Sequence, residues 1–93
     1  MYEIENLPIH EQVYEFLRSN RIVHNAADFC REYLGKSRSY MNTLKYTQHS
    51  PSPDAYRQLS ERIGMLLAEE YKSETKDELK YLQEQIDVIL EKT

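Results

Sequence analysis

The chain has 93 residues, of which 40% are apolar, two are Gly and three are Pro, and its formal net charge is −4 at pH 7. This length suits one domain, and the low Gly and Pro content favours an all-α fold. A single cysteine, Cys30, excludes an internal disulfide, and no apolar run approaches the roughly 18 residues of a membrane span. We therefore expect a soluble, cytoplasmic protein.

The first elements along the chain are an arm and a helix. Residues 1–7 are polar with scattered apolar side chains, and we expect a flexible arm there. Pro8 suits the first turn of a helix, and Asn20 is a reasonable stop, so the first helix is expected over residues 8–19. Its apolar residues recur at helical spacing and form one stripe: Ile9, Val13, Phe16 and Leu17.

Two short helices follow, separated by Gly35. Asn25 is the predicted N-cap of the second helix, with Asp28 three residues later as in a capping box. Gly35 ends that helix because it adopts positive φ without a Cβ clash. Ser37 is the predicted cap of the third helix, whose inner face holds Met41 and Leu44. At about 100° per residue, the opposite face holds Arg38, Ser39, Asn42 and Tyr46.

Two further helices complete the chain. Ser52, Pro53 and Asp54 are a cap, a first-turn proline and an acid at the positive helix end. Gly64 either breaks the fourth helix or allows a close helix contact, and the sequence leaves both open. The final segment, residues 73–93, is an expected amphipathic helix with a capping box at Thr75 and Glu78. Its apolar stripe must be buried and consists of Leu79, Leu82, Ile86, Ile89 and Leu90.

That final stripe has three possible fates. It folds back on the domain, pairs with a second copy, or docks on another protein. We favour a homodimer, which places residues 79–90 in a dimer interface and divides the chain into a domain at 8–72 and a dimerisation helix at 73–93.

Charge is unevenly distributed. Residues 17–62 hold eight basic and four acidic residues, a net charge of +4, whereas residues 69–93 hold four basic and eight acidic ones, a net charge of −4. A basic middle can approach phosphate, and an acidic tail should point away from it.

The second and third helices resemble the helix-turn-helix of the Cro/CI-type (λ-repressor-like, XRE-like) DNA-binding family. The matching segments are residues 33–35 (Tyr-Leu-Gly), the Ser-rich turn at 36–41, the Ser-Pro loop at 50–53 and the helix at 56–64. The chain is also similar to small bacterial proteins with a Tyr-Leu-Gly-Lys/Arg-Ser-x-Ser-Tyr core. The resemblance covers residues 8–67 and implies a bundle of four to five helices with a C-terminal extension. It departs at Arg31, where the family has Ala, so the turn is expected to hold one extra residue.

This resemblance implies a transcriptional regulator, in our interpretation a repressor, with a recognition helix at about 37–47 in the major groove of double-stranded DNA. Arg38 suits guanine and Asn42 suits adenine, while other side chains reach bases or phosphates. The full expected DNA-binding set is Asn25, Lys36, Ser37, Arg38, Ser39, Asn42, Thr43, Lys45, Tyr46 and His49.

No pattern of catalytic or metal-binding residues is present in the sequence. His10, His24 and His49 lack ligand spacing, Cys30 is expected in the core, and no phosphate loop or nucleophile elbow occurs. We expect no enzyme activity, cofactor or metal. The alternative to a DNA-binding regulator is a helical protein-interaction module, or an antitoxin-like protein, that binds another regulatory protein through its acidic C-terminal helix.

Overall fold

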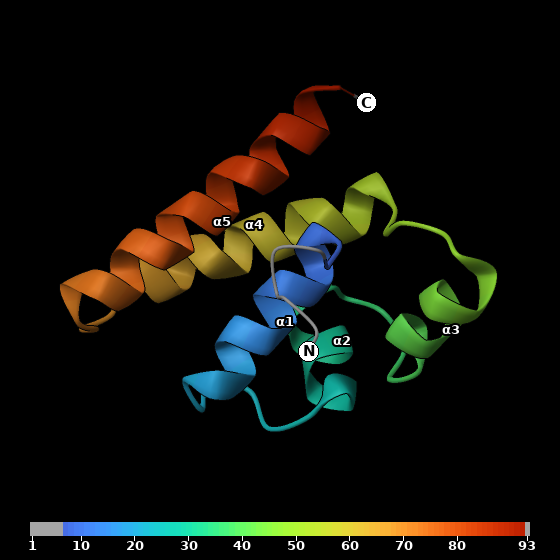
Figure 1. The fold of residues 1–93 in the computed structure, drawn as a ribbon, viewed down its shortest axis with the longest axis horizontal. Coiled ribbons are helices and arrows are strands. Elements are labelled where there is room, and N and C mark those ends of the chain that lie inside the picture. The colour runs from blue at the N-terminus through green and yellow to red at the C-terminus, as the bar shows by residue number, and fades with distance from the viewer. Residues whose placement is uncertain (1–6, 93) are drawn as a thin grey trace.

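The computed structural model describes residues 7–92, which form five α-helices and no strand (Figure 1). The helices are α1 (Ile9–Ser19), α2 (Ala26–Tyr33), α3 (Tyr40–Thr47), α4 (Pro53–Leu67) and α5 (Ser73–Glu91). The all-α prediction is confirmed. Apart from Leu7, the arm predicted at residues 1–7 lies outside the described residues.

Two of the predicted helix caps form as expected. The side-chain oxygen of Asn25 accepts a hydrogen bond from the Asp28 backbone N–H at 2.9 Å, at the start of α2. At the start of α4, the Ser52 hydroxyl accepts one from the Ala55 N–H at 3.3 Å. Both caps satisfy a backbone donor that has no partner within the helix, so these two starts follow from local sequence.

Two other predicted helix starts are wrong. Ser37 does not cap α3, because residues 37–39 form a turn in which the Tyr40 N–H donates to the Ser37 carbonyl at 3.0 Å. The capping box at Thr75 and Glu78 does not form either. The chain is already helical at Ser73, and the Lys76 N–H donates to the Lys72 carbonyl at 3.0 Å.

The core joins α5 to the rest of the chain. Helices α4 and α5 run side by side in opposite directions, with α1 against them (Figure 1). Leu79, Leu82 and Ile86 are at most 1% exposed and belong to one cluster with Val13 and Leu17 of α1. Ile89 and Leu90 pack against the same cluster.

The predicted dimer interface is corrected at Leu79, Leu82 and Ile86, because these side chains are buried within their own chain and need no second copy to cover them. Ile89 and Leu90 are partly buried, and their place in a dimer interface stays a prediction. The predicted division between residues 8–72 and 73–93 is corrected for the same reason, because α5 is part of the single core.

Gly64 allows a close contact between α4 and α5, and the helix continues through it. A Cβ atom at Gly64 would lie 3.3 Å from the Gln83 side-chain nitrogen. That nitrogen donates to the Ser60 carbonyl at 3.0 Å, and the Ser60 hydroxyl donates to Asp87 at 2.9 Å. Of the two readings that the sequence left open, the close contact is the one that occurs.

Helix α3 lies at the edge of the molecule (Figure 1). Its inner side chains, Met41 and Leu44, are each 5% exposed. At its start the Tyr40 phenol oxygen accepts a hydrogen bond from the Ser52 backbone N–H at 3.1 Å. At its end Gln48 adopts the left-handed conformation with φ of 57°. The helix is thus fixed at both ends while its other side stays in solvent.

Candidate nucleic-acid interface

The connection between α2 and α3 is six residues long, from Leu34 to Ser39. Gly35 has φ of +64°, and the Lys36 N–H donates to the Cys30 carbonyl at 3.0 Å, which turns the chain back across the last turn of α2. The predicted recognition helix at 37–47 is therefore too long. Ser37, Arg38 and Ser39 lie in the turn that follows the left-handed Gly35, and the Tyr40 N–H donates to the Ser37 carbonyl where α3 begins.

One face of α3 points into solvent. Asn42, Thr43 and Tyr46 are exposed and follow Ser39 at spacings of three, four and seven residues, so the four lie on one side of the helix. Tyr46 is 91% exposed, the highest value among the large hydrophobic side chains of the structure's described part. The Thr43 hydroxyl donates to the Ser39 carbonyl at 3.2 Å. Within residues 7–92, the Asn42 amide and the Tyr46 hydroxyl have no hydrogen-bond partner.

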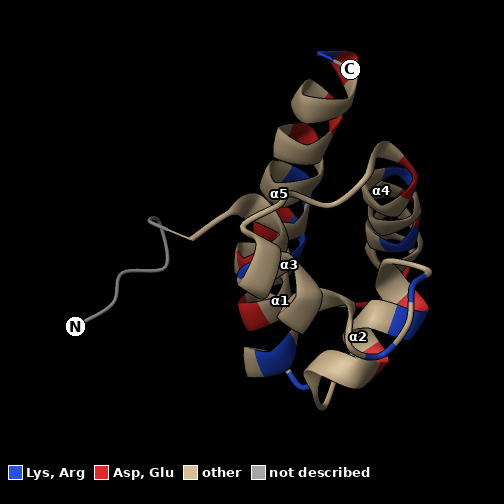
Figure 2. Ribbon diagram, turned by 90° about the vertical axis from the view of Figure 1, so that its right-hand side faces the viewer, with Lys and Arg blue, Asp and Glu red and all other residues tan. Residues whose placement is uncertain are grey.

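Basic residues lie at the start of this face. Arg38 is exposed on the α2–α3 connection, and the Lys36 ammonium lies 5.9 Å from the centre of the Tyr40 ring. Figure 2 shows Lys and Arg on this connection, whereas α5 carries acidic residues along its length together with Lys76 and Lys80.

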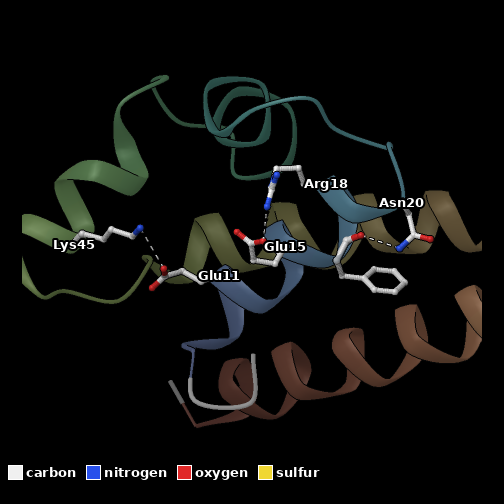
Figure 3. Close-up of polar contacts among 6 residues, drawn as sticks. Glu11, Glu15, Arg18, Asn20 and Lys45 are labelled. Atoms are coloured by element: carbon white, nitrogen blue, oxygen red, sulfur yellow. Dashed lines mark hydrogen bonds and ion pairs between the residues drawn. The ribbon is translucent and has the colours of Figure 1, made fainter. Parts of the chain in front are cut away.

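Lys45 lies apart from this group. Its ammonium reaches back toward α1 and lies 3.5 Å from the Glu11 carboxylate (Figure 3). Because α3 turns by about 100° per residue, Lys45 is about a quarter turn away from Tyr46. The predicted set therefore divides into residues on the outward face and one cation at its flank.

Asn25 is less suited to phosphate than the sequence suggested. Its side-chain oxygen is occupied by the cap of α2, and Asp28 places a carboxylate in the first helical turn. That carboxylate accepts a hydrogen bond from Arg31 at 2.9 Å. An anion site at a helix start requires free N–H groups. A phosphate at the start of α2 would instead meet the negative charge of Asp28.

His49 lines a pocket behind α3. The pocket measures about 360 Å³ and lies between the start of α1 and the end of α3. Its lining residues are Pro8, His10, Glu11, Leu44, Lys45, Gln48, His49 and Ser50. His49 therefore lies beside the outward face and contributes to a different surface from Asn42 and Tyr46.

His10, in this pocket, is the residue that sequence reasoning overlooked. It is 3% exposed, and its Nδ1 has no hydrogen-bond partner among the described residues. Burial lowers the pKa of His10; the Glu11 charge opposes this change and the Lys45 charge adds to it. The signal was present in the sequence, because His10, Val13 and Leu17 follow one another at helical spacing and all three are buried.

The described residues show no group of side chains that would hold a metal ion and no helix that would cross a membrane. Across residues 7–92, no three His, Cys, Asp or Glu side chains are grouped so that they would hold a metal ion. None of the five helices there has the length and apolar character needed to cross a membrane.

These features define an all-α protein of five helices with an exposed polar face on α3. The chain belongs to DUF6626, a family of unknown function, whose family model matches residues 10–92. No curated protein and no solved structure matches the chain. The resemblance to Cro/CI-type helix-turn-helix proteins stays a prediction from the sequence.

Proposed function

We propose that this protein is a sequence-specific, DNA-binding transcriptional regulator that acts by occupying its site. In this proposal α3 enters the major groove and α2 crosses the backbone. The observation that carries it is the outward face of α3, where Asn42 and Tyr46 are exposed and make no side-chain hydrogen bond within the described chain. Polar groups free of internal partners are what readout of base edges requires.

Each residue of this face has a specific role in the proposal. Arg38 donates to guanine O6 and N7, and Asn42 exchanges two hydrogen bonds with adenine. Ser39, Thr43 and Tyr46 reach bases or phosphates farther along the groove. Lys36 neutralises backbone phosphate and His49, at the flank of this face, donates a hydrogen bond to it; such contacts orient the protein but carry no sequence information. Because Arg38 is on the turn, it meets the DNA at the amino end of α3.

A second copy extends the contact in this proposal. Helix α3 has eight residues and spans few base pairs, so a homodimer that reads two half-sites about 34 Å apart would raise affinity. The apolar stripe of α5 is in the core, which leaves its outer side for pairing. Tyr81 and Val88 lie one heptad apart on α5 and are 50% and 44% exposed. We assign the dimer contact to these two side chains.

The test is selection of bound fragments from a random duplex library, at near-physiological salt, by the purified protein. We expect a shared, roughly palindromic motif. Arg38→Ala and Asn42→Ala should each reduce the binding preference for the correct base over other bases by about 1–3 kcal/mol at one position of the motif. Lys80→Ala removes the same charge from α5 and should bind as the wild type does. Recovery of no motif by the wild type would contradict the proposal.

The outer side of α5 also supports a second candidate function, a protein-interaction module. It carries exposed acidic residues around Tyr81 and Val88, and an acidic surface with apolar anchors suits a basic protein partner. Salt separates the two functions, because protein binding releases counterions from duplex DNA and the free energy gained by that release falls steeply as the salt concentration rises.

A further inference from the structure

An ion pair joins Glu11 of α1 to Lys45 of α3. The Glu11 carboxylate oxygen lies 3.5 Å from the Lys45 ammonium, and the two residues are 34 positions apart in the chain (Figure 3). The other three ion pairs of the described residues join positions three apart on one helix. The Glu11–Lys45 pair is therefore the one that couples α3 to another helix.

The two partners differ in freedom. The Glu11 side chain is 17% exposed, whereas that of Lys45 is 63% exposed. Glu11 also lies in the first turn of α1, where the positive end of the helix dipole favours a carboxylate. Lys45 has a long flexible stem, and the pocket of about 360 Å³ beside it leaves space for that stem to move. Glu11 is thus the fixed partner and Lys45 the movable one.

We propose that Glu11 competes with DNA phosphate for Lys45 and so sets the strength of binding without affecting which sequence is bound. This inference rests on the proposed DNA-binding function, because α3 must lie in the groove for Lys45 to come near a phosphate. While Lys45 is paired with Glu11, it does not contact the DNA backbone. When the pair opens, Lys45 adds one phosphate contact, and phosphate contacts strengthen binding to all sequences alike.

Glu11 therefore sets the overall affinity for duplex DNA although it touches no base, and the ratio of specific to other binding stays unchanged. A regulator must find its site among a large excess of other duplex, and uniform phosphate attraction increases binding to that excess. Withholding one cation lowers the uniform part of the binding and leaves the base contacts of Arg38 and Asn42 intact.

The experiment measures duplex affinity across a salt series for the wild type, Glu11→Gln, Lys45→Gln and the double variant. Glu11→Gln keeps the side-chain shape and removes the charge. We expect it to bind every duplex more tightly and to steepen the slope of log K against log salt by about 0.9, the value for one phosphate contact. In the Lys45→Gln background the same change should have no effect on the slope. Base preference should be the same in all four proteins.

A matched control is available on the same helix. Glu15→Gln removes the same charge one turn farther along α1, where the carboxylate is paired with Arg18 at 2.9 Å and not with α3. Its slope should equal that of the wild type. Equal gains from Glu11→Gln and Glu15→Gln would overturn the inference in favour of a general charge effect.

The remaining outcomes separate the inference from the function on which it rests. A Glu11→Gln slope equal to that of the wild type, or a gain that persists without Lys45, overturns the Glu11 role and leaves DNA binding intact. Failure of the wild type to bind any duplex overturns both. A helical circular dichroism spectrum for each variant shows that the comparison is between folded proteins.

Discussion

The phenol oxygen of Tyr40 accepts a hydrogen bond at 3.1 Å from the backbone N–H of Ser52, and this bond joins the first residue of α3 to the N-cap of α4. The bond spans the whole of α3 and the loop behind it. Because it is part-buried, neither group is freely replaced by water. It therefore ties the start of α3 to the start of α4.

Tyr40→Phe should lower the free energy of unfolding by about 0.5–1.5 kcal/mol, because it leaves the Ser52 N–H without its acceptor. Urea unfolding followed by circular dichroism measures the change. Tyr46→Phe is the matched control, since Tyr46 is 91% exposed and its hydroxyl makes no hydrogen bond within residues 7–92. Equal stability of Tyr40→Phe and Tyr46→Phe would show that the Tyr40–Ser52 bond contributes nothing.

The two glycines should respond differently to alanine. Gly35 has φ of +64°, so Gly35→Ala forces a side chain into the left-handed region and should destabilise by about 1–2 kcal/mol. Gly64 is within α4, where alanine is favoured by about 1 kcal/mol. The new Cβ would lie 3.3 Å from the flexible end of Gln83, which offsets part of that gain.

Thermal unfolding of both variants tests this contrast. Gly64→Ala should stay within about 0.5 kcal/mol of the wild type, while Gly35→Ala should melt at a lower temperature. The reverse order would mean that Gln83 cannot move away from Gly64.

Helix α5 should be required for folding. Leu82 is 1% exposed in the shared core, and Leu82→Ala should cost about 2–5 kcal/mol through lost burial and a cavity. Tyr81→Ala, at the neighbouring position, removes a side chain that is 50% exposed and should cost less. Denaturant unfolding of the two variants gives the comparison. A chain ending at Lys72 should lose most of its helical signal, and retention of that signal would contradict the single-core description.

Stability should fall as pH decreases below about 6.5. Burial lowers the pKa of His10 below the 6.5 of an exposed histidine, so the folded protein binds this proton more weakly than the unfolded chain does. The stabilisation that neutral His10 contributes is fully present above the pKa of this histidine in the unfolded chain. It is lost as the pH falls through that value toward the lower pKa of His10 in the folded protein. Urea midpoints at about pH 7.5 and about pH 5.5 should therefore differ.

His10→Gln should reduce the pH dependence, because glutamine does not titrate. His24→Gln changes an exposed histidine and should keep the dependence of the wild type. An undiminished pH effect in His10→Gln would assign the titration to other groups.

Local sequence predicted those parts of the fold that depend on neighbouring residues. The caps at Asn25 and Ser52 and the turn at Gly35 each involve a short-range hydrogen bond or a backbone conformation, so they were readable directly. The hydrogen bond between Tyr40 and Ser52 at the start of α3 was not, because it joins residues twelve positions apart.

The candidate site divides in the same way. Helical spacing alone placed Asn42 and Tyr46 on an outward face, and both are exposed. Lys45 was expected among the DNA-binding residues, but periodicity does not say which neighbouring helix a flanking side chain faces, and the structure pairs Lys45 with Glu11.

By itself, the sequence determined that the chain is helical, where two caps and one turn form, and that an apolar stripe on residues 79–90 must be buried. Only the tertiary structure decided what buries it: α5 lies along α4 and joins the core, so Leu79, Leu82 and Ile86 are not a surface for a second copy. The physical reason is that apolar burial has no direction. The amino-acid pattern states how much surface must leave water, and the packing of helices distant in sequence selects the partner that covers it.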